Sequence, residues 1–119
     1  MKIALIGDVH ANLPALDAVL SDAHKRGVEA IWNVGDLVGW AFPDEVIKRL
    51  QQENVLSIIG NSDVKVLKVK EKKEEWKDKT PPEKWFAFNW AYDKLSEPSR
   101  QYLNSLPEET RLEIEGKNI

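Results

Sequence analysis

Three short apolar runs stand in the first half of the chain, and a glycine follows each of them. The runs cover residues 2–6, 29–34 and 54–59, and the glycines are Gly7, Gly35 and Gly60. Their length and their β-branched residues are typical of buried strands. Two stretches with apolar residues at helical spacing separate the runs. Strands that alternate with helices over short connections predict right-handed crossovers and a parallel sheet, so the predicted fold class is α/β.

The helical stretches carry recognisable start and stop signals. Asn12 is suited to cap the first helix, Pro14 falls in its first turn, and Gly27 ends it. The second helix is expected to begin near Asp44, which is its predicted cap. The residues predicted to face inward from it are Val46, Ile47 and Leu50.

The second half of the chain is richer in charge and in aromatic residues. Residues 64–79 mix lysines with acids, which fits either a basic surface for phosphates or a solvated helix with ion pairs. The interleaved acids favour the solvated helix. Thr80 and Glu83 then have capping-box spacing, and the helix that follows carries more aromatic groups than one core face requires. A short helix at 98–106 and a strand at 111–115 are expected to complete this half.

Polar side chains follow each predicted strand. Asp8 and His10 lie two positions apart after Gly7, and Asp36 and Asn61 follow the other two glycines. Residues two positions apart on an extended chain point the same way, so Asp8 and His10 can converge. A carboxylate and an imidazole together suit Mn²⁺, Fe²⁺ or Zn²⁺. Taken alone, an Asp-x-His triplet favours a simple polar loop, but the carboxyl ends of parallel strands are where ligands bind.

The motifs after the three runs are Asp8-Val9-His10, Gly35-Asp36 and Gly60-Asn61. In this order they resemble the first half of the signature of the calcineurin-like metallophosphoesterases, nearest to the small phosphodiesterases of bacteria and archaea. The resemblance implies the N-terminal half of the α-β-β-α sandwich of that family, with parallel strands, crossover helices and a helical C-terminal segment. Residues 1–119 are then expected to form one incomplete domain.

The resemblance also implies a two-metal site. Asp8 and His10 would hold one ion, Asp36 would bridge the two ions, and Asn61 would hold the second. Mn²⁺ is the expected metal, with Fe, Zn or Ni as alternatives. Asp36, Asn61 and Asp63 are the expected catalytic residues.

Three further residues are expected to contact the substrate. Asn12 is a helix cap that can also meet a phosphate at the helix N-terminus. Trp40, in the loop after Asp36, is either a lid over the substrate or a hydrophobic plug. Ser62 stands where the commonest family motif has a histidine that assists the leaving group, and an alcohol is a poor proton donor at neutral pH.

The resemblance implies further histidines that are absent here, since the chain holds only His10 and His24. Half of the family sandwich would also leave an apolar sheet face open to water. We therefore expect a homodimer or a separately encoded second half. The predicted function is a metal-dependent phosphoric ester hydrolase, a phosphodiesterase or phosphatase. The alternatives are an inactive metal- or phosphate-binding subunit and an oligomeric interaction domain.

The composition of the chain argues against several other functional classes. The net charge of the 119 residues is −3, which does not favour nucleic acid as a partner. The absence of cysteine excludes disulfides, zinc ribbons and thiol catalysis in this sequence. The first residues run directly into a strand, and no apolar run reaches membrane-spanning length. These features lead us to expect a cytoplasmic protein without a membrane partner.

Overall fold

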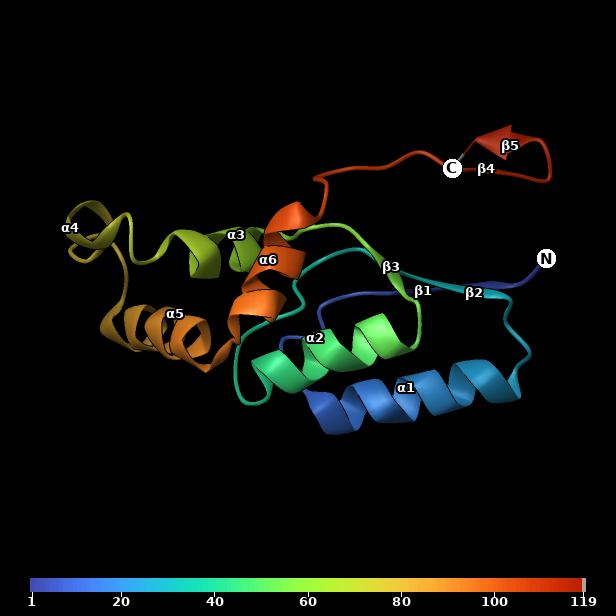
Figure 1. Cartoon of the computed structure of the whole chain (residues 1–119), viewed down its shortest axis with the longest axis horizontal. Helices are drawn as coiled ribbons and strands as arrows, with labels where there is room; N and C mark the ends of the chain where they lie inside the picture. The colour runs from blue at the N-terminus through green and yellow to red at the C-terminus, as the bar shows by residue number, and fades with distance from the viewer. Residues whose placement is uncertain (119) are drawn as a thin grey trace.

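The computed structural model describes residues 1–118, and its centre is a three-stranded parallel sheet in the order β1-β2-β3 (Figure 1). The strands are β1 (Ile3–Ile6), β2 (Ala30–Asn33) and β3 (Leu56–Ser57). Parallel pairing confirms the predicted α/β class. The third strand is shorter than its apolar run because the chain turns away at its end, where the Ile59 N–H donates to the Pro107 carbonyl (2.9 Å).

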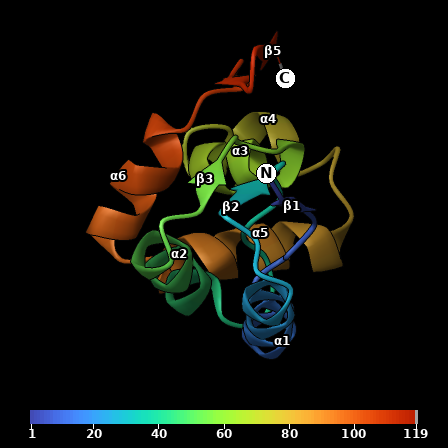
Figure 2. The same ribbon diagram turned by 90° about the vertical axis from the view of Figure 1, so that its right-hand side faces the viewer.

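Two crossover helices, α1 (Leu13–Lys25) and α2 (Pro43–Gln52), cover one face of this sheet (Figure 2). Most of their inward positions are the ones that the helical spacing predicts, and they form the core with β2. Val19, which the same spacing predicts to be buried, is instead 43% exposed. The most buried members of this core are Leu16, Leu20, Ile31, Val46, Ile47 and Leu50. The expectation that Asp44 caps α2 is wrong. Phe42 is the N-cap, and the Asp44 side chain turns instead toward Ser96 (Oδ1 to the Ser96 N–H, 2.9 Å).

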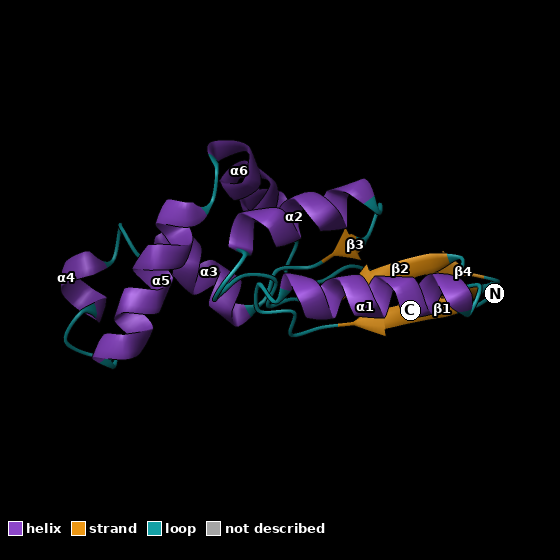
Figure 3. Ribbon diagram, turned by 90° about the horizontal axis from the view of Figure 1, so that it is seen from below, coloured by secondary structure: helices purple, strands orange, loops and turns teal. Residues whose placement is uncertain are grey.

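A group of helices lies beyond the carboxyl ends of the strands (Figures 1 and 3). It comprises α3 (Asn61–Lys68), α4 (Lys73–Trp76), α5 (Pro82–Lys94) and α6 (Glu97–Ser105). The charged segment thus forms two short helices and not one. The expected capping box at Thr80 is also wrong, because α5 has Pro81 as its N-cap and no side chain caps it.

The other face of the sheet is only partly covered. A tail carrying β4 (Glu113–Ile114) and β5 (Lys117–Asn118), which pair antiparallel, follows α6. Part of this tail lines a cavity of about 270 Å³ with apolar side chains of the strands. Leu5 and Val34 on this face remain 65% and 56% exposed. None of the helices in the described chain has the length and apolarity to traverse a bilayer.

Candidate metal centre

The loops after β1 and β2 lie side by side because their backbones extend the pairing of the strands. The Asp8 N–H donates to the Gly35 carbonyl (3.2 Å), and the His10 N–H donates to the Asp36 carbonyl (2.9 Å). Each loop therefore holds the other in place. Three of the four predicted metal ligands, Asp8, His10 and Asp36, take part in these bonds.

These ligand candidates also share an uncommon backbone conformation. Asp8, His10 and Asp36 have φ values of 54°, 45° and 57°, in the left-handed region. A residue with a side chain is disfavoured there, and such positions persist where the surroundings hold them and often mark functional sites. The hydrogen bonds between the two loops supply that constraint.

The side chains of these three residues converge. One ligand atom each from Asp8, His10 and Asp36 lies within 4.8 Å of the other two, and the His10 Nε2 is 3.7 Å from an Asp8 carboxylate oxygen. The Asp8 side chain is 79% exposed and that of His10 48%, so both are open to an incoming ion. Two carboxylates and one imidazole at this spacing fit a divalent transition ion.

The third loop packs directly on Asp36. The Ser62 N–H donates to the Asp36 Oδ1 (3.0 Å), and a Cβ added to Gly60 would lie 2.3 Å from that same oxygen. Only glycine fits this approach. Asn61, the predicted ligand of a second ion, begins α3 on this rim and is exposed.

Asp63 is fully buried beneath the rim and joins two loops. Its Oδ1 accepts from the N–H groups of Leu37 (2.8 Å) and Val38 (3.1 Å), and its Oδ2 accepts from the Gly60 N–H (2.9 Å). Burial raises the pKa of the Asp63 carboxyl, the three N–H bonds oppose this, and the nearby Asp36 charge adds to the rise. Both oxygens are occupied, so the structure gives this residue a role in holding the loops. An acid at the third position of a helix is a recognisable capping signal.

The predicted substrate contacts have different surroundings. The Asn12 Oδ1 accepts from the Ala15 N–H (3.1 Å), which confirms the predicted cap of α1. Trp40 is 63% exposed, and its ring centroid lies 4.2 Å from that of Trp90 in α5. This tilted pair ties α5 to the loop after β2. Trp90 is one of the surplus aromatic residues that the sequence shows in this helix, but its contact with Trp40 does not follow from the sequence.

His24 does not join the centre. Its Nε2 lies 3.0 Å from a Glu53 carboxylate oxygen, and the imidazole is 58% exposed at the end of α1, as its place in the last helical turn predicts. Within residues 1–118, the converging group of His, Asp and Glu side chains consists of Asp8, His10 and Asp36.

Known proteins resemble this chain in sequence. The model of the calcineurin-like phosphoesterase superfamily domain matches residues 1–119. The chain belongs to this family. An uncharacterised protein of Methanocaldococcus jannaschii is 36% identical over 118 residues, which cover 98% of this chain and 46% of that protein.

Two solved structures extend the likeness to three dimensions. A metallophosphoesterase from Sphaerobacter thermophilus is 38% identical with a TM-score of 0.70, over 94% of this chain and 43% of that one. A hypothetical protein from Pyrococcus horikoshii is 25% identical with a TM-score of 0.79, over 98% of this chain and 52% of that one. The chain therefore spans about half the length of the relatives that it matches. It has the metallophosphoesterase fold over that half.

Proposed function

We propose that this chain is part of a metal-dependent phosphoric ester hydrolase that acts on phosphodiesters or phosphomonoesters. The observation that carries the proposal is the convergence of Asp8, His10 and Asp36 within 4.8 Å at the rim of the sheet. Membership of the calcineurin-like family supports a phosphate ester as the substrate.

The residues at the rim of the sheet would each bind one or both of two metal ions. Asp8 and His10 would hold one ion, Asp36 would be shared between two ions, and Asn61 would hold the second. Mn²⁺ is the proposed metal, with Fe, Zn or Ni as alternatives, because carboxylate and imidazole donors together accept each of these ions. A bound divalent ion supplies positive charge that polarises the phosphoryl group.

Substrate positioning falls to groups beside these ligands. The Asn12 side chain, whose Oδ1 caps α1, is exposed, and its amide NH₂ group can contact phosphoryl oxygens. Ser62 lies in the first turn of α3 against Asp36, and Trp40 lies in the loop that follows Asp36, so both can contact the ester. Asp63 holds the loops after β2 and β3 at a fixed separation and so contributes to catalysis through position.

We further propose that the complete site takes ligands from a second protein chain. The converging group within residues 1–118 has one imidazole, and the apolar sheet face remains open. A second copy of this chain or a separately encoded partner would cover the face and can supply further donors.

Mn²⁺ binding and turnover test the proposal together. Calorimetric titration with Mn²⁺ and hydrolysis of bis-p-nitrophenyl phosphate are measured for the wild type, for Asp36→Ala and for Asp22→Ala. We expect Asp36→Ala to weaken Mn²⁺ binding by more than about 100-fold and to abolish turnover, because it removes the shared carboxylate. Asp22 lies on the exposed surface of α1, paired with Arg26, so its loss should change neither.

The pattern of results separates the functional classes. Mn²⁺ binding without turnover by the wild type would favour either the metal- or phosphate-binding subunit or a site whose remaining ligands come from a separately encoded partner. A wild type that binds no Mn²⁺ would contradict the proposed function.

A further inference from the structure

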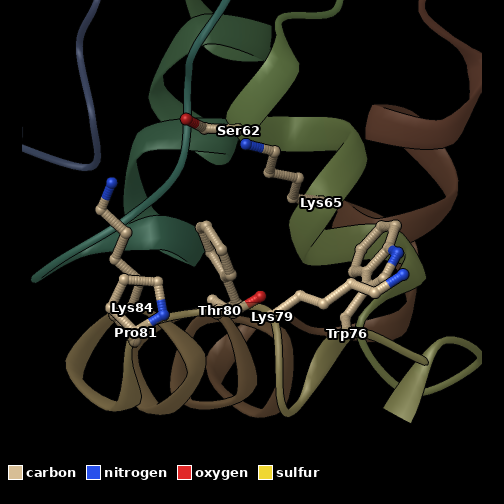
Figure 4. Close-up of a pocket in the computed structure, with 9 residues that line it drawn as sticks. Ser62, Lys65, Trp76, Lys79, Thr80, Pro81 and Lys84 are labelled. Atoms are coloured by element: carbon tan, nitrogen blue, oxygen red, sulfur yellow. The ribbon is translucent and has the colours of Figure 1, made fainter. Parts of the chain in front are cut away.

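A cavity of about 530 Å³ lies beside the metal centre, between α3, the segment that ends α4, and α5 (Figure 4). This volume is in the range of sites for small organic ligands. The side chains that give the cavity its chemistry are Ser62, Lys65, Trp76, Lys79, Lys84 and Phe88.

The cavity and the metal centre share Ser62. The Ser62 backbone N–H donates to the Asp36 Oδ1 (3.0 Å), and the same residue lines the cavity. An ester whose phosphoryl group lies at Asp36 can therefore extend past Ser62 into this space. The cavity is placed to hold the part of the substrate that does not react.

The charge of the cavity is strongly positive. Lys65, Lys79 and Lys84 line it, and no acidic residue does so in the described part of the chain. Over residues 1–118 these three lysines form no ion pair, whereas Lys48 and Lys70 each pair with an aspartate. In Figure 4 the Lys65 side chain points toward Ser62, and Lys84 extends into the cavity from α5. Three unpaired ammonium groups around one space favour a ligand with several negative charges.

Two aromatic rings add a second kind of contact. Trp76 at the end of α4 and Phe88 in α5 both line the cavity and are partly exposed. Aromatic side chains that are open to solvent within a pocket can stack on a planar ring of a ligand. A simple inorganic anion would leave both rings unused.

We propose that this cavity binds a nucleoside polyphosphate group, with the lysines on the phosphate chain and the rings of Trp76 and Phe88 against the base. That this group is the leaving group of the substrate rests on the proposed phosphoesterase function. The binding itself does not depend on a metal. The segment 64–79, whose sequence favours a merely solvated surface, thus contributes Lys65, Trp76 and Lys79 to one binding site.

Calorimetry in EDTA tests the cavity separately from the metal centre. The probes are adenosine 5′-triphosphate, inorganic tripolyphosphate and adenosine, each titrated into the whole chain. We expect the triphosphate to bind, and the two partial probes to bind at least about tenfold more weakly, because each offers only one of the two contacts. Lys65→Ala and Lys84→Ala should each weaken the binding of the triphosphate by about tenfold.

Lys68→Ala is the matched control, since it removes the same charge from α3 outside this cavity. Equal weakening by Lys68→Ala would overturn the proposal, as would the absence of triphosphate binding at millimolar concentration. Tripolyphosphate that binds as tightly as the triphosphate would overturn the assignment of a nucleoside. Because Mn²⁺ binding is measured in a separate titration, a failure of nucleotide binding in the cavity can be distinguished from a failure of the proposed metal-dependent function.

Discussion

Gly60 and Asp36 lie closer together than any side chain on Gly60 would permit. A Cβ on Gly60 would be 2.3 Å from both the backbone nitrogen and Oδ1 of Asp36. Gly35, the neighbour of Asp36, is equally crowded, with its added Cβ 2.9 Å from the Gly60 Cα. The backbone has little room to move here, because Asp63 bonds to Gly60 from below. The position of the Asp36 carboxylate therefore requires a residue without a side chain at position 60.

Gly60→Ala should displace Asp36 and disrupt the metal centre. We expect the affinity for Mn²⁺ to fall by about 10- to 100-fold, because the carboxylate loses its orientation. The overpacked methyl should also lower the free energy of unfolding by about 1–3 kcal/mol. Mn²⁺ calorimetry and chemical denaturation measure the two effects.

Gly27→Ala is the control for this substitution. Gly27 has a φ of 69° and open space around its Cβ position, so the change should cost about 1 kcal/mol in stability through backbone strain alone. It should leave Mn²⁺ affinity unchanged. Unaltered Mn²⁺ affinity in Gly60→Ala would show that the close approach does not position Asp36.

Among the secondary-structure elements, the corner between α5 and α6 depends on a side chain from α2. The Asp44 Oδ1 accepts from the Ser96 N–H (2.9 Å) and from the Ser96 hydroxyl (2.8 Å), and Ser96 caps α6. The Arg100 guanidinium donates to the carbonyl of Leu95 (2.9 Å) in the same corner. The two hydrogen bonds of Asp44 connect the group of helices α3 to α6 to the crossover helix α2, and so fix the position of α5 relative to the metal centre.

The ionisation of Asp44 reports on this connection. Burial opposes the charged form, but hydrogen bonds from Ser99, Lys48 and Ser96 outweigh it and hold the pKa of the carboxyl well below its ordinary value of 3.8. A pKa that is lower in the folded state stabilises the fold above the pKa of the unfolded chain. This contribution is lost as the pH falls below about 4.

Asp44→Ala should lower the free energy of unfolding by about 2 kcal/mol near pH 7, because it leaves the Ser96 groups without a charged acceptor. The difference from the wild type should shrink as the pH falls from about 5 toward 3. Urea denaturation across this pH range measures it. Asp22→Ala, which breaks an exposed ion pair on α1, should cost less than about 1 kcal/mol. A pH-independent difference for Asp44→Ala would contradict the assigned cause.

On the scale of the whole molecule, the sheet is covered on one face and largely open on the other. Helices α1 and α2 bury the first face, while Leu5, Val34 and Leu56 are exposed by 43% or more on the second. The tail after α6 lines only part of this second face. Contiguous apolar surface of this kind favours association with another chain.

We expect the purified chain to form a dimer through this face, which light scattering coupled to size exclusion measures directly. Leu5→Lys combined with Val34→Lys should raise the dissociation constant by at least about tenfold, because the ammonium groups would have to be desolvated. Val19→Lys on α1, where Val19 is 43% exposed, should have no effect. A wild type that remains monomeric at all concentrations would contradict this expectation.

Much of the fold follows from the order of residues along the chain. Apolar runs that end in glycine predict β1 and β2 closely, since a buried strand needs apolar side chains and a sharp turn needs glycine. Asn12 and Gly27 likewise predict the two ends of α1. Asp44 and Thr80 show where such reasoning fails. A capping side chain has several backbone partners within reach, and only the packing of distant helices selects among them.

The sequence by itself determined the parallel sheet and the edge at which Asp8, His10 and Asp36 gather, because strand periodicity and turn residues are local properties. Only the tertiary structure decided that Asp63 holds two loops together, that Trp90 packs against Trp40, and that three lysines from α3, α5 and the turn after α4 line one cavity. These contacts join residues from different elements. Such contacts depend on how whole helices pack, which no local pattern encodes.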